Sequence, residues 1–315
     1  MSTAPRFLEV DDLTASSLRR VLDRARQWKE KPGEIRPVLT GHSVAAVFEK
    51  PSARTRVSFE VAVVTLGGHC VTLKGDDLGL GRRESVADVA RTLASYCSFV
   101  GARVFDHRVL EEMARAIDVP VLNLLSNQAH PGQAVGDLLT LEECFGTPVE
   151  GRRLAFVGDG NNVAASLALA AALTGLEMVV SSPAGYELDD AVIERARNLG
   201  GTLELVADPF EAVAGADAVY TDVWTSMGQE SEAAARLAAF AAYQVNSDLL
   251  ETAGPDVVFL HCLPAHRGEE VTDEVLDGPA SAVWVQAANR MHSYRSLLVE
   301  LFELADSGPH GAGEV

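Results

Sequence analysis

Hydroxyl and guanidinium side chains follow one another closely at residues 52–56, whose sequence is Ser-Ala-Arg-Thr-Arg. The segment lies between the apolar run 43–47 and residues 57–63, whose apolar positions have helical spacing. This order predicts a buried strand, a short turn and the first turn of a helix. The N–H groups at a helix start attract anions, and guanidinium groups and hydroxyls add directed hydrogen bonds. An ordinary N-cap with surface arginines is the alternative, but the full pattern favours a phosphate site.

Polar side chains also follow other predicted strands. Ligands in open parallel sheets bind at the carboxyl ends of the strands, so these residues are candidates for a binding site. Taken singly, each has a simpler explanation, since a histidine before proline is commonly a turn residue and a buried cysteine commonly packs in a core. Their combined placement favours a site. In chain order the candidates are Arg103, His130, Gln133, Asn161, Asn162, Asp222, Ser226, His261, Cys262, Gln286 and Arg290.

Short apolar runs alternate with segments of helical periodicity along the whole chain, which is typical of parallel sheets. The Gly- and Pro-containing segment 146–151 interrupts this pattern, which then starts again. We therefore expect an α/β protein of two domains, each a parallel β-sheet flanked by helices, with the active site in the cleft between them. Strands are expected at 43–47, 70–73, 98–104, 119–124, 154–157, 177–181, 202–206, 218–221, 257–260 and 282–286, with a first helix over 12–29, capped near Asp11 or Asp12, and a last helix over about 289–305.

The composition narrows the class of protein. Of the 315 residues, 47% are hydrophobic and 23% charged, which suits two globular domains. The net charge of −19 argues against nucleic acid as a partner, because phosphate backbones require a basic surface. No apolar stretch is long enough for a bilayer, so we expect a cytoplasmic protein without a membrane partner. The four cysteines lack Cys-x-x-Cys spacing, so neither a disulfide framework nor a zinc site is indicated.

The sequence Gly-Asp-Gly at 158–160 resembles the start of a dinucleotide-binding fingerprint. The complete fingerprint requires a glycine three residues beyond Gly160, where Val163 stands, so the signal is weak. Asn161 and Asn162 at the start of the following helix offer another use, because a helix N-terminus can hold a carboxylate.

Four motifs together carry a resemblance to a known family. They are Ser-Ala-Arg-Thr-Arg at 52–56, His-Pro-Gly-Gln at 130–133, Asp-Val-Trp-Thr-Ser-Met-Gly at 222–228 and His-Cys-Leu-Pro at 261–264. In these motifs and their order, the chain resembles the ornithine carbamoyltransferases of the aspartate/ornithine carbamoyltransferase superfamily over nearly its whole length. The first two motifs are shared by all carbamoyltransferases. The last two are typical of the ornithine branch, because an aspartate enzyme is expected to have His-Pro-Leu-Pro.

The resemblance implies transfer of the carbamoyl group of carbamoyl phosphate to the δ-amine of L-ornithine, giving L-citrulline and phosphate. It implies no metal and no organic cofactor. It also implies a homotrimer or a higher assembly of trimers. Residues 1–146 would form the carbamoyl-phosphate-binding domain, with the last helix packing back on it, and residues 147–288 would form the ornithine-binding domain.

The resemblance also implies roles for particular residues. Arg103, His130, Asp222 and Cys262 would be catalytic, with Cys262 as acceptor or relay for the proton that the δ-amine loses. The residues that would bind carbamoyl phosphate are Ser52, Ala53, Arg54, Thr55, Arg103, His130, Gln133, Cys262, Leu263 and Arg290. Those that would bind ornithine are Asn161, Asn162, Asp222, Ser226 and Met227.

Two positions depart from the family pattern. Ala53 stands where many relatives have threonine, so one hydroxyl is missing while the backbone amide remains. Gly79 stands where family members often have a glutamine or histidine that reaches the neighbouring subunit's carbamoyl phosphate. A side-chain contact from this loop is therefore not expected.

Three alternatives remain at the level of sequence. The chain could be a carbamoyltransferase for another amine, such as putrescine or N-acetylornithine, although Asp222 favours a free α-amino acid. It could be a nucleotide-dependent oxidoreductase, but Ser181-Ser182 stand where an acidic residue is expected. It could be a non-catalytic paralogue, against which the retention of Arg54 and Cys262 argues.

Overall fold

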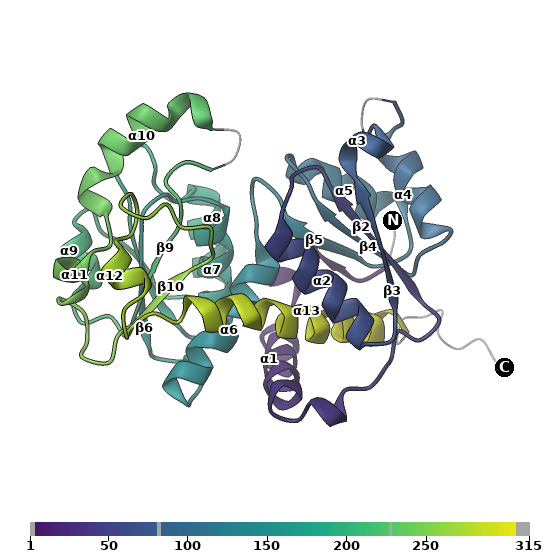
Figure 1. Cartoon of the computed structure of the whole chain (residues 1–315), viewed down its shortest axis with the longest axis horizontal. Helices are drawn as coiled ribbons and strands as arrows, with labels where there is room; N and C mark the ends of the chain where they lie inside the picture. The colour runs from purple at the N-terminus through teal and green to yellow at the C-terminus, as the bar shows by residue number, and fades with distance from the viewer. Residues whose placement is uncertain (1–3, 81–82, 227–228, 307–315) are drawn as a thin grey trace. The chain divides into compact units, whose positions relative to one another are not determined.

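The computed structural model describes residues 4–80, 83–226 and 229–306, which form two compact units. Unit 1 contains the described residues of Met1–Val135 and of Arg290–Val315, and unit 2 those of Gly136–Asn289. The division falls inside two helices, α6 (Pro131–Phe145) and α13 (Val283–Asp306). Each unit contains one five-stranded, all-parallel sheet flanked by helices (Figure 1), which confirms the expected α/β architecture.

The sheet of unit 1 has the strand order β1-β5-β4-β2-β3. Its central strands are buried on both faces, as continuous apolar sequences require. Helices α4 and α5 pack on one face through a shared apolar core, whereas Phe59 of α2 contacts the other face at Gly101. The elements are β1 (Arg6–Phe7), α1 (Ala15–Glu30), β2 (Ser43–Phe48), α2 (Ala53–Thr65), β3 (His69–Lys74), α3 (Gly75–Leu78), α4 (Val86–Ala94), β4 (Phe99–Arg103), α5 (His107–Ala116) and β5 (Val121–Leu125), with 3-10 turns at Val10–Asp12 and Pro32–Glu34.

The sheet of unit 2 has the strand order β10-β9-β6-β7-β8. Helices α9, α11 and α12 share an apolar core with the strands, and α7 and α8 lie against the opposite face (Figure 1). The elements are β6 (Arg153–Val157), α7 (Asn162–Thr174), β7 (Glu177–Ser181), α8 (Asp190–Asn198), β8 (Leu203–Leu205), α9 (Pro209–Val213), β9 (Ala218–Thr221), α10 (Ala233–Phe240), α11 (Ser247–Leu250), β10 (Val258–His261) and α12 (Asp273–Leu276), with 3-10 turns at Glu230–Glu232 and Ala241–Tyr243.

Both sheets reverse their strand order at one place. In unit 1 the chain passes from β2 to β3 on one side and then to β4 on the other. In unit 2 it passes from β6 outward to β7 and β8, then returns to β9 on the opposite side of β6. Connections leave such a point in opposite directions, so ligands of open parallel sheets bind outside the strand ends there. The reversals lie between β2 and β4 in unit 1 and between β6 and β9 in unit 2. Candidate residues stand at or after the end of each of these four strands, so they lie where a ligand is expected.

Two local predictions are wrong. Residues 282–286 do not form a strand, because Val283 begins α13 and the exposed Trp284 and Val285 face away from any sheet. A short apolar run cannot distinguish a strand from the first turn of a helix. The first helix is capped at Thr14, whose Oγ1 accepts the Ser17 N–H at 3.1 Å, and not near Asp11 or Asp12.

None of the helices in the described ranges is both long enough and apolar enough to cross a membrane.

Gly160 is needed for close packing in unit 2. Its N–H donates to the Tyr186 carbonyl at 2.8 Å, and a Cβ atom at this position would lie 2.3 Å from the Leu188 nitrogen. Because the clash is with backbone, we expect Gly160→Ala to lower the free energy of unfolding by about 1–3 kcal/mol. Denaturant unfolding measures this, with Gly33→Ala as control, since no atom lies within 4 Å of its Cβ position. Equal stability of the two variants would contradict the packing role.

Candidate active site

A cluster of buried hydrogen-bonding groups surrounds Thr55 in unit 1. The Thr55 Oγ1 accepts from Arg290 Nη2 at 2.7 Å and from Arg103 Nη1 at 3.3 Å. Ser52 Oγ donates to the same oxygen at 3.0 Å. Thr55, Arg103 and Arg290 are all buried. Two guanidinium groups from β4 and α13 therefore meet at one hydroxyl in the first turn of α2, which is an arrangement suited to an anion.

The start of α2 matches the sequence prediction. Ser52 is the N-cap, and its Oγ accepts the Thr55 N–H at 3.3 Å. Ala53 and Arg54 occupy the exposed beginning of the first turn, where backbone N–H groups have no intrahelical acceptor. Arg56 lies apart from the cluster, because its Nε pairs with Glu60 Oε1 at 2.9 Å one turn further on. Of the two arginines in the segment, only Arg54 is therefore placed at the helix start.

His130 and Gln133 are buried beside this cluster at the beginning of α6. The close approach of α6 to α13 depends on Gly132, since a Cβ atom there would lie 2.5 Å from the Tyr294 ring. Burial lowers the pKa of His130 well below its usual value, and the positive charges of Arg290 and Arg103 lower it further. The imidazole is therefore neutral near pH 7 and retains one N–H donor.

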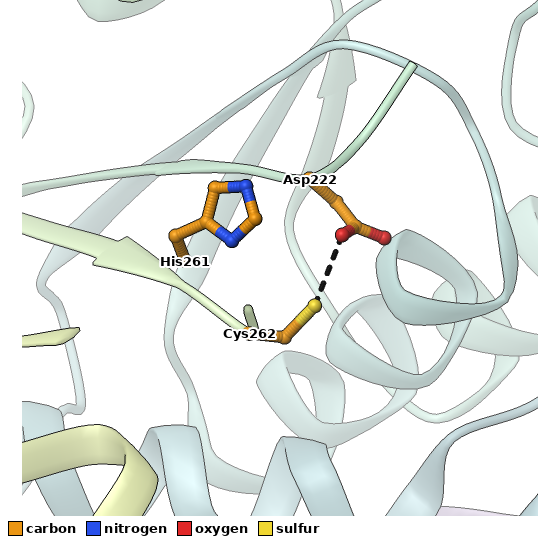
Figure 2. A group of neighbouring side chains, drawn as sticks. All are labelled: Asp222, His261 and Cys262. Carbon is orange, nitrogen blue, oxygen red and sulfur yellow. Dashed lines mark hydrogen bonds between the residues drawn. The ribbon is translucent and has the colours of Figure 1, made fainter. Parts of the chain in front are cut away.

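In unit 2 a second group of side chains meets at Asp222. The Cys262 thiol donates to Asp222 Oδ1 at 3.0 Å, and Asn161 Nδ2 donates to Asp222 Oδ2 at 2.8 Å (Figure 2 shows the Cys262 contact). The oxygen of the Asn161 side chain caps α7 by accepting the N–H groups of Val163 and Ala164. Both ends of the Asn161 amide thus form bonds within the protein, and Asn162 is the first residue of α7.

The backbone around Cys262 is held by His261. His261 Nδ1 accepts the Leu263 N–H at 2.8 Å, and Nε2 lies 3.1 Å from Glu270 Oε1, with both side chains fully buried. Leu263 has a φ of 58° and is followed by a cis peptide bond to Pro264. The internal bonds of His261 fix this turn and so orient the carbonyl groups of Cys262 and Leu263. Glu270 was not among the candidates, because nothing in the local sequence indicates its pairing with His261.

Asp222, His261 and Cys262 offer ligand atoms within 4.8 Å of one another, a spacing that a metal ion could use (Figure 2). Both ring nitrogens of His261 already form the bonds to Leu263 and Glu270. Coordination by His261 would require one of these buried bonds to break, which makes the group poorly suited to a metal. The absence of a metal cofactor stays a prediction.

Three further candidates come from the second half of the chain. Ser226 is half-buried, and its N–H donates to Gln229 Oε1 at 3.1 Å. Met227, expected among the ornithine-binding residues, lies outside the described residues. Gln286 lies in α13 of unit 2, where its side chain accepts the His261 N–H at 2.9 Å and donates to Asp137 at 2.7 Å.

Both units match models of one family. The model described as the aspartate/ornithine carbamoyltransferase carbamoyl-P binding domain matches residues 6–143, and that of the Asp/Orn binding domain matches residues 150–301. The chain belongs to the aspartate/ornithine carbamoyltransferase family. These two matches together cover most of the chain, with Thr55 inside the first matched range and Asp222 inside the second.

Individual members of the family are similar over nearly their whole length. The ornithine carbamoyltransferase of Acidothermus cellulolyticus is 51% identical over 303 residues, which are 95% of this chain and 97% of that protein. The structure of ornithine carbamoyltransferase from Pyrococcus furiosus has a TM-score of 0.90 at 48% identity, covering 95% and 97% of the two chains. That of the Thermus thermophilus enzyme has a TM-score of 0.87 at 45% identity, covering 95% and 99%.

The lowered pKa of His130 makes stability depend on pH. Below a pH of about 6.5 the unfolded state binds a proton at this residue that the folded state does not, so folding becomes less favourable as the pH falls. We expect the unfolding free energy of the wild type to fall by up to about 1.4 kcal/mol per pH unit relative to His130→Asn. Denaturant unfolding at pH 8, 6.5 and 5.5 tests this. Parallel pH profiles of the two proteins would contradict a buried neutral His130.

Proposed function

We propose that this chain catalyses transfer of the carbamoyl group of carbamoyl phosphate to the δ-amine of L-ornithine, giving L-citrulline and phosphate. The observation that carries the proposal is the Cys262–Asp222–Asn161 group at the strand reversal of unit 2, in a chain of this family. Cys262 stands where the aspartate branch is expected to have proline, and the relatives of 45–51% identity are named ornithine carbamoyltransferases.

Carbamoyl phosphate would bind at the Thr55 cluster. Its phosphate would accept from the side chains of Ser52, Arg54 and Thr55 and from the amides at the start of α2, including that of Ala53. Arg103 would contact both the phosphate and the carbonyl oxygen. The carbamoyl group would be oriented by Gln133, Arg290 and the carbonyl groups of Cys262 and Leu263. The geometry of the helix start and the family pattern support these roles.

The reaction builds negative charge on the carbonyl oxygen as the carbon becomes tetrahedral. Thr55, Arg103 and a neutral His130 each offer a hydrogen-bond donor from a buried position. Donors fixed before the reaction stabilise this charge without reorganisation, and each can contribute a few kcal/mol. A charged His130 would add repulsion between three cations, so its lowered pKa suits it to the role of a neutral donor.

Ornithine would bind at the Asp222 group. Asn162 at the start of α7 would hold the α-carboxylate, with Asn161 beside it, and Asp222 would hold the α-ammonium, assisted by Ser226 and Met227. The δ-amine must lose a proton before it attacks, because an ammonium has no lone pair and a similar amine has a pKa of about 10.4. Cys262, whose thiol donates to Asp222 in the structure, would relay that proton by passing its own proton to Asp222 as it takes one from the amine. The departing phosphate can be the final proton acceptor. The amine attacks the carbonyl carbon directly as the bond to phosphate breaks, so no covalent bond to the thiol forms.

We also propose a division of the chain into two ligand-binding domains. Residues 1–146 would be the carbamoyl-phosphate-binding domain and residues 147–288 the ornithine-binding domain, and the catalytic cycle would need both. A cytoplasmic location stays a prediction.

A carbamoyltransferase for a different amine is the second candidate. Putrescine lacks the carboxylate that Asn162 would bind, and N-acetylornithine lacks the free ammonium that Asp222 would bind. The buried carboxylate of Asp222, which has two partners of its own, favours an ammonium over an acetylated nitrogen. Comparing citrulline-type product formation from ornithine, putrescine, lysine and N-acetylornithine separates the two.

The central experiment measures citrulline formation by the wild type and by matched arginine variants. We expect Arg54→Ala to lower kcat/KM for carbamoyl phosphate by about 100-fold or more, because it removes a charged donor at the helix start. Arg56→Ala, two residues further on, should change it by no more than about twofold, because Arg56 pairs with Glu60. Cys262→Ala should lower kcat. Equal effects of the two arginine substitutions would contradict the placement of the phosphate.

We also propose a homotrimer. Helix α2 exposes Val57, Val61 and Val64 at 57%, 40% and 61%, and these residues recur at helical spacing along one face. The neighbouring edge strand β3 exposes Val71. An apolar stripe beside an open sheet edge is a typical subunit contact.

Light scattering tests the assembly. The wild type should have three times the chain mass of 33.5 kDa, and Val61→Asp should lower the mass to that of a single chain by placing charge in the contact. Leu205→Asp, which adds the same charge at an exposed position of unit 2, should leave the mass unchanged. A wild type that runs as a monomer would overturn the trimer.

A further inference from the structure

Arg236 is a buried arginine that contacts three loops of unit 2. It belongs to none of the four sequence motifs. Arg236 of α10 is 6% exposed. Its Nη1 donates both to Asp159 Oδ2 at 2.8 Å and to the Trp224 carbonyl at 2.9 Å. Its Nε donates to Glu232 at 3.1 Å, and its guanidinium carbon lies 4.8 Å from the centre of the Tyr186 ring. Asp159 follows β6, Trp224 follows β9 and Tyr186 follows β7.

Two of the three acceptors of Arg236, Asp159 and the Trp224 carbonyl, stand next to the Asp222 group in the sequence. Asp159 precedes Asn161 by two residues, and Trp224 follows Asp222 by two residues. Asn161 and Asp222 are themselves joined by the 2.8 Å hydrogen bond. The loops after β6 and β9 are therefore tied twice, once between the candidate ligand residues and once behind them by the guanidinium.

Trp224 depends on this contact for its position. Its ring is buried and stacks on the ring of Phe240, with the two ring centres 5.8 Å apart. Its indole N–H has no hydrogen-bond acceptor among the described residues. The carbonyl bond to Arg236 is thus the polar contact that fixes the backbone after Asp222. Asp159 is buried as well, and burial raises the pKa of its carboxyl, while the charge of Arg236 favours the ionised form. Removing the guanidinium would leave a buried carboxylate without its cation.

We propose that Arg236 is a positioning residue for the amino-acid substrate, because it sets the distance between the loop of Asn161 and Asn162 and the loop of Asp222. It touches no substrate itself. The inference rests on the proposed function and adds a determinant of ornithine affinity that acts from α10, through Asp159 and the Trp224 carbonyl. Arg236 should not affect the affinity for carbamoyl phosphate, because the proposed phosphate contacts lie in unit 1.

The chain contains a matched control at the opposite ends of the same two strands. Arg152 precedes β6 and Asp217 precedes β9, and Arg152 Nη1 donates to Asp217 Oδ1 at 2.8 Å. The Arg152 guanidinium also lies over an aromatic ring, that of Phe145, at 4.9 Å. This pair has the same residue types and contact distance as the Arg236–Asp159 pair, but its side chains are 41% and 30% exposed against 7% and 10%. It also lies away from the strand ends that carry the candidate site.

The test compares Arg236→Gln, Asp159→Asn and Arg152→Gln in steady-state citrulline formation. We expect Arg236→Gln to raise KM for ornithine by at least about tenfold and KM for carbamoyl phosphate by less than twofold. Asp159→Asn, which preserves shape, should raise KM for ornithine in the same direction, and the double variant should be no worse than Arg236→Gln, since the two act as one unit. Arg152→Gln should change neither KM. A purely structural role of Arg236 would instead shift the two KM values together or leave both unchanged.

Calorimetry with L-norvaline, which is ornithine without its δ-amine and so cannot react, provides a second readout in the presence of carbamoyl phosphate. Binding should weaken in Arg236→Gln and Asp159→Asn by the same factor as KM. If the wild type makes citrulline but Arg236→Gln and Asp159→Asn keep wild-type KM and norvaline affinity, the positioning role is wrong and the proposed function stands. If the wild type neither makes citrulline nor binds norvaline, the proposed function is wrong and the inference fails with it.

Discussion

The order of strands in the two parallel sheets is the constraint on which the candidate site depends. All strands of a parallel sheet present their carboxyl ends at one edge, and only where the order reverses do neighbouring loops diverge and leave room for a ligand. Strands β2 and β4 flank the reversal in unit 1, and β6 and β9 flank it in unit 2. Thr55 and Arg103 lie at the ends of the first pair, and Asn161 and Asp222 follow the second, whereas Arg290 comes from α13 and Cys262 follows β10. The topology therefore concentrates residues that are far apart in sequence at two defined points.

Buried polar contacts then give these points their geometry. The turn after β10 is held by His261, through its bonds to Leu263 and Glu270. The loops after β6 and β9 are joined by Asn161 and Asp222 and, behind them, by Arg236. A buried polar group that loses its partner costs about 1–3 kcal/mol, and a buried charge costs more, so each contact restricts the loop to one conformation. The ligand-facing groups are thus positioned by residues that need not touch a ligand.

The overall charge sets a condition on how an anionic substrate is bound. A chain of net charge −19 repels an anion at long range, although salt screens the repulsion beyond about 8–10 Å. Under the proposed function, affinity for carbamoyl phosphate would therefore come from short-range contacts at the start of α2. There Arg103 and Arg290 are buried beside Thr55, where local charge is screened least. Buried positive groups can thus bind an anion even though the net charge of the whole chain is negative.

The sequence by itself determined the local elements and the chemistry of the motifs. The buried strand before Ser52 and the start of a helix within residues 52–56 could be predicted because their signals lie within a few residues of one another. The run at 282–286 belongs to α13 and not to the expected strand, since its apolar residues fit either element until tertiary packing selects one. Only the tertiary structure decided the pairs that lie far apart in the chain: Arg290 with Thr55, Glu270 with His261, and Arg236 with Asp159. No sequence period encodes such pairs, because they arise when strand order and helix packing bring distant segments together and burial then makes an unpaired partner costly.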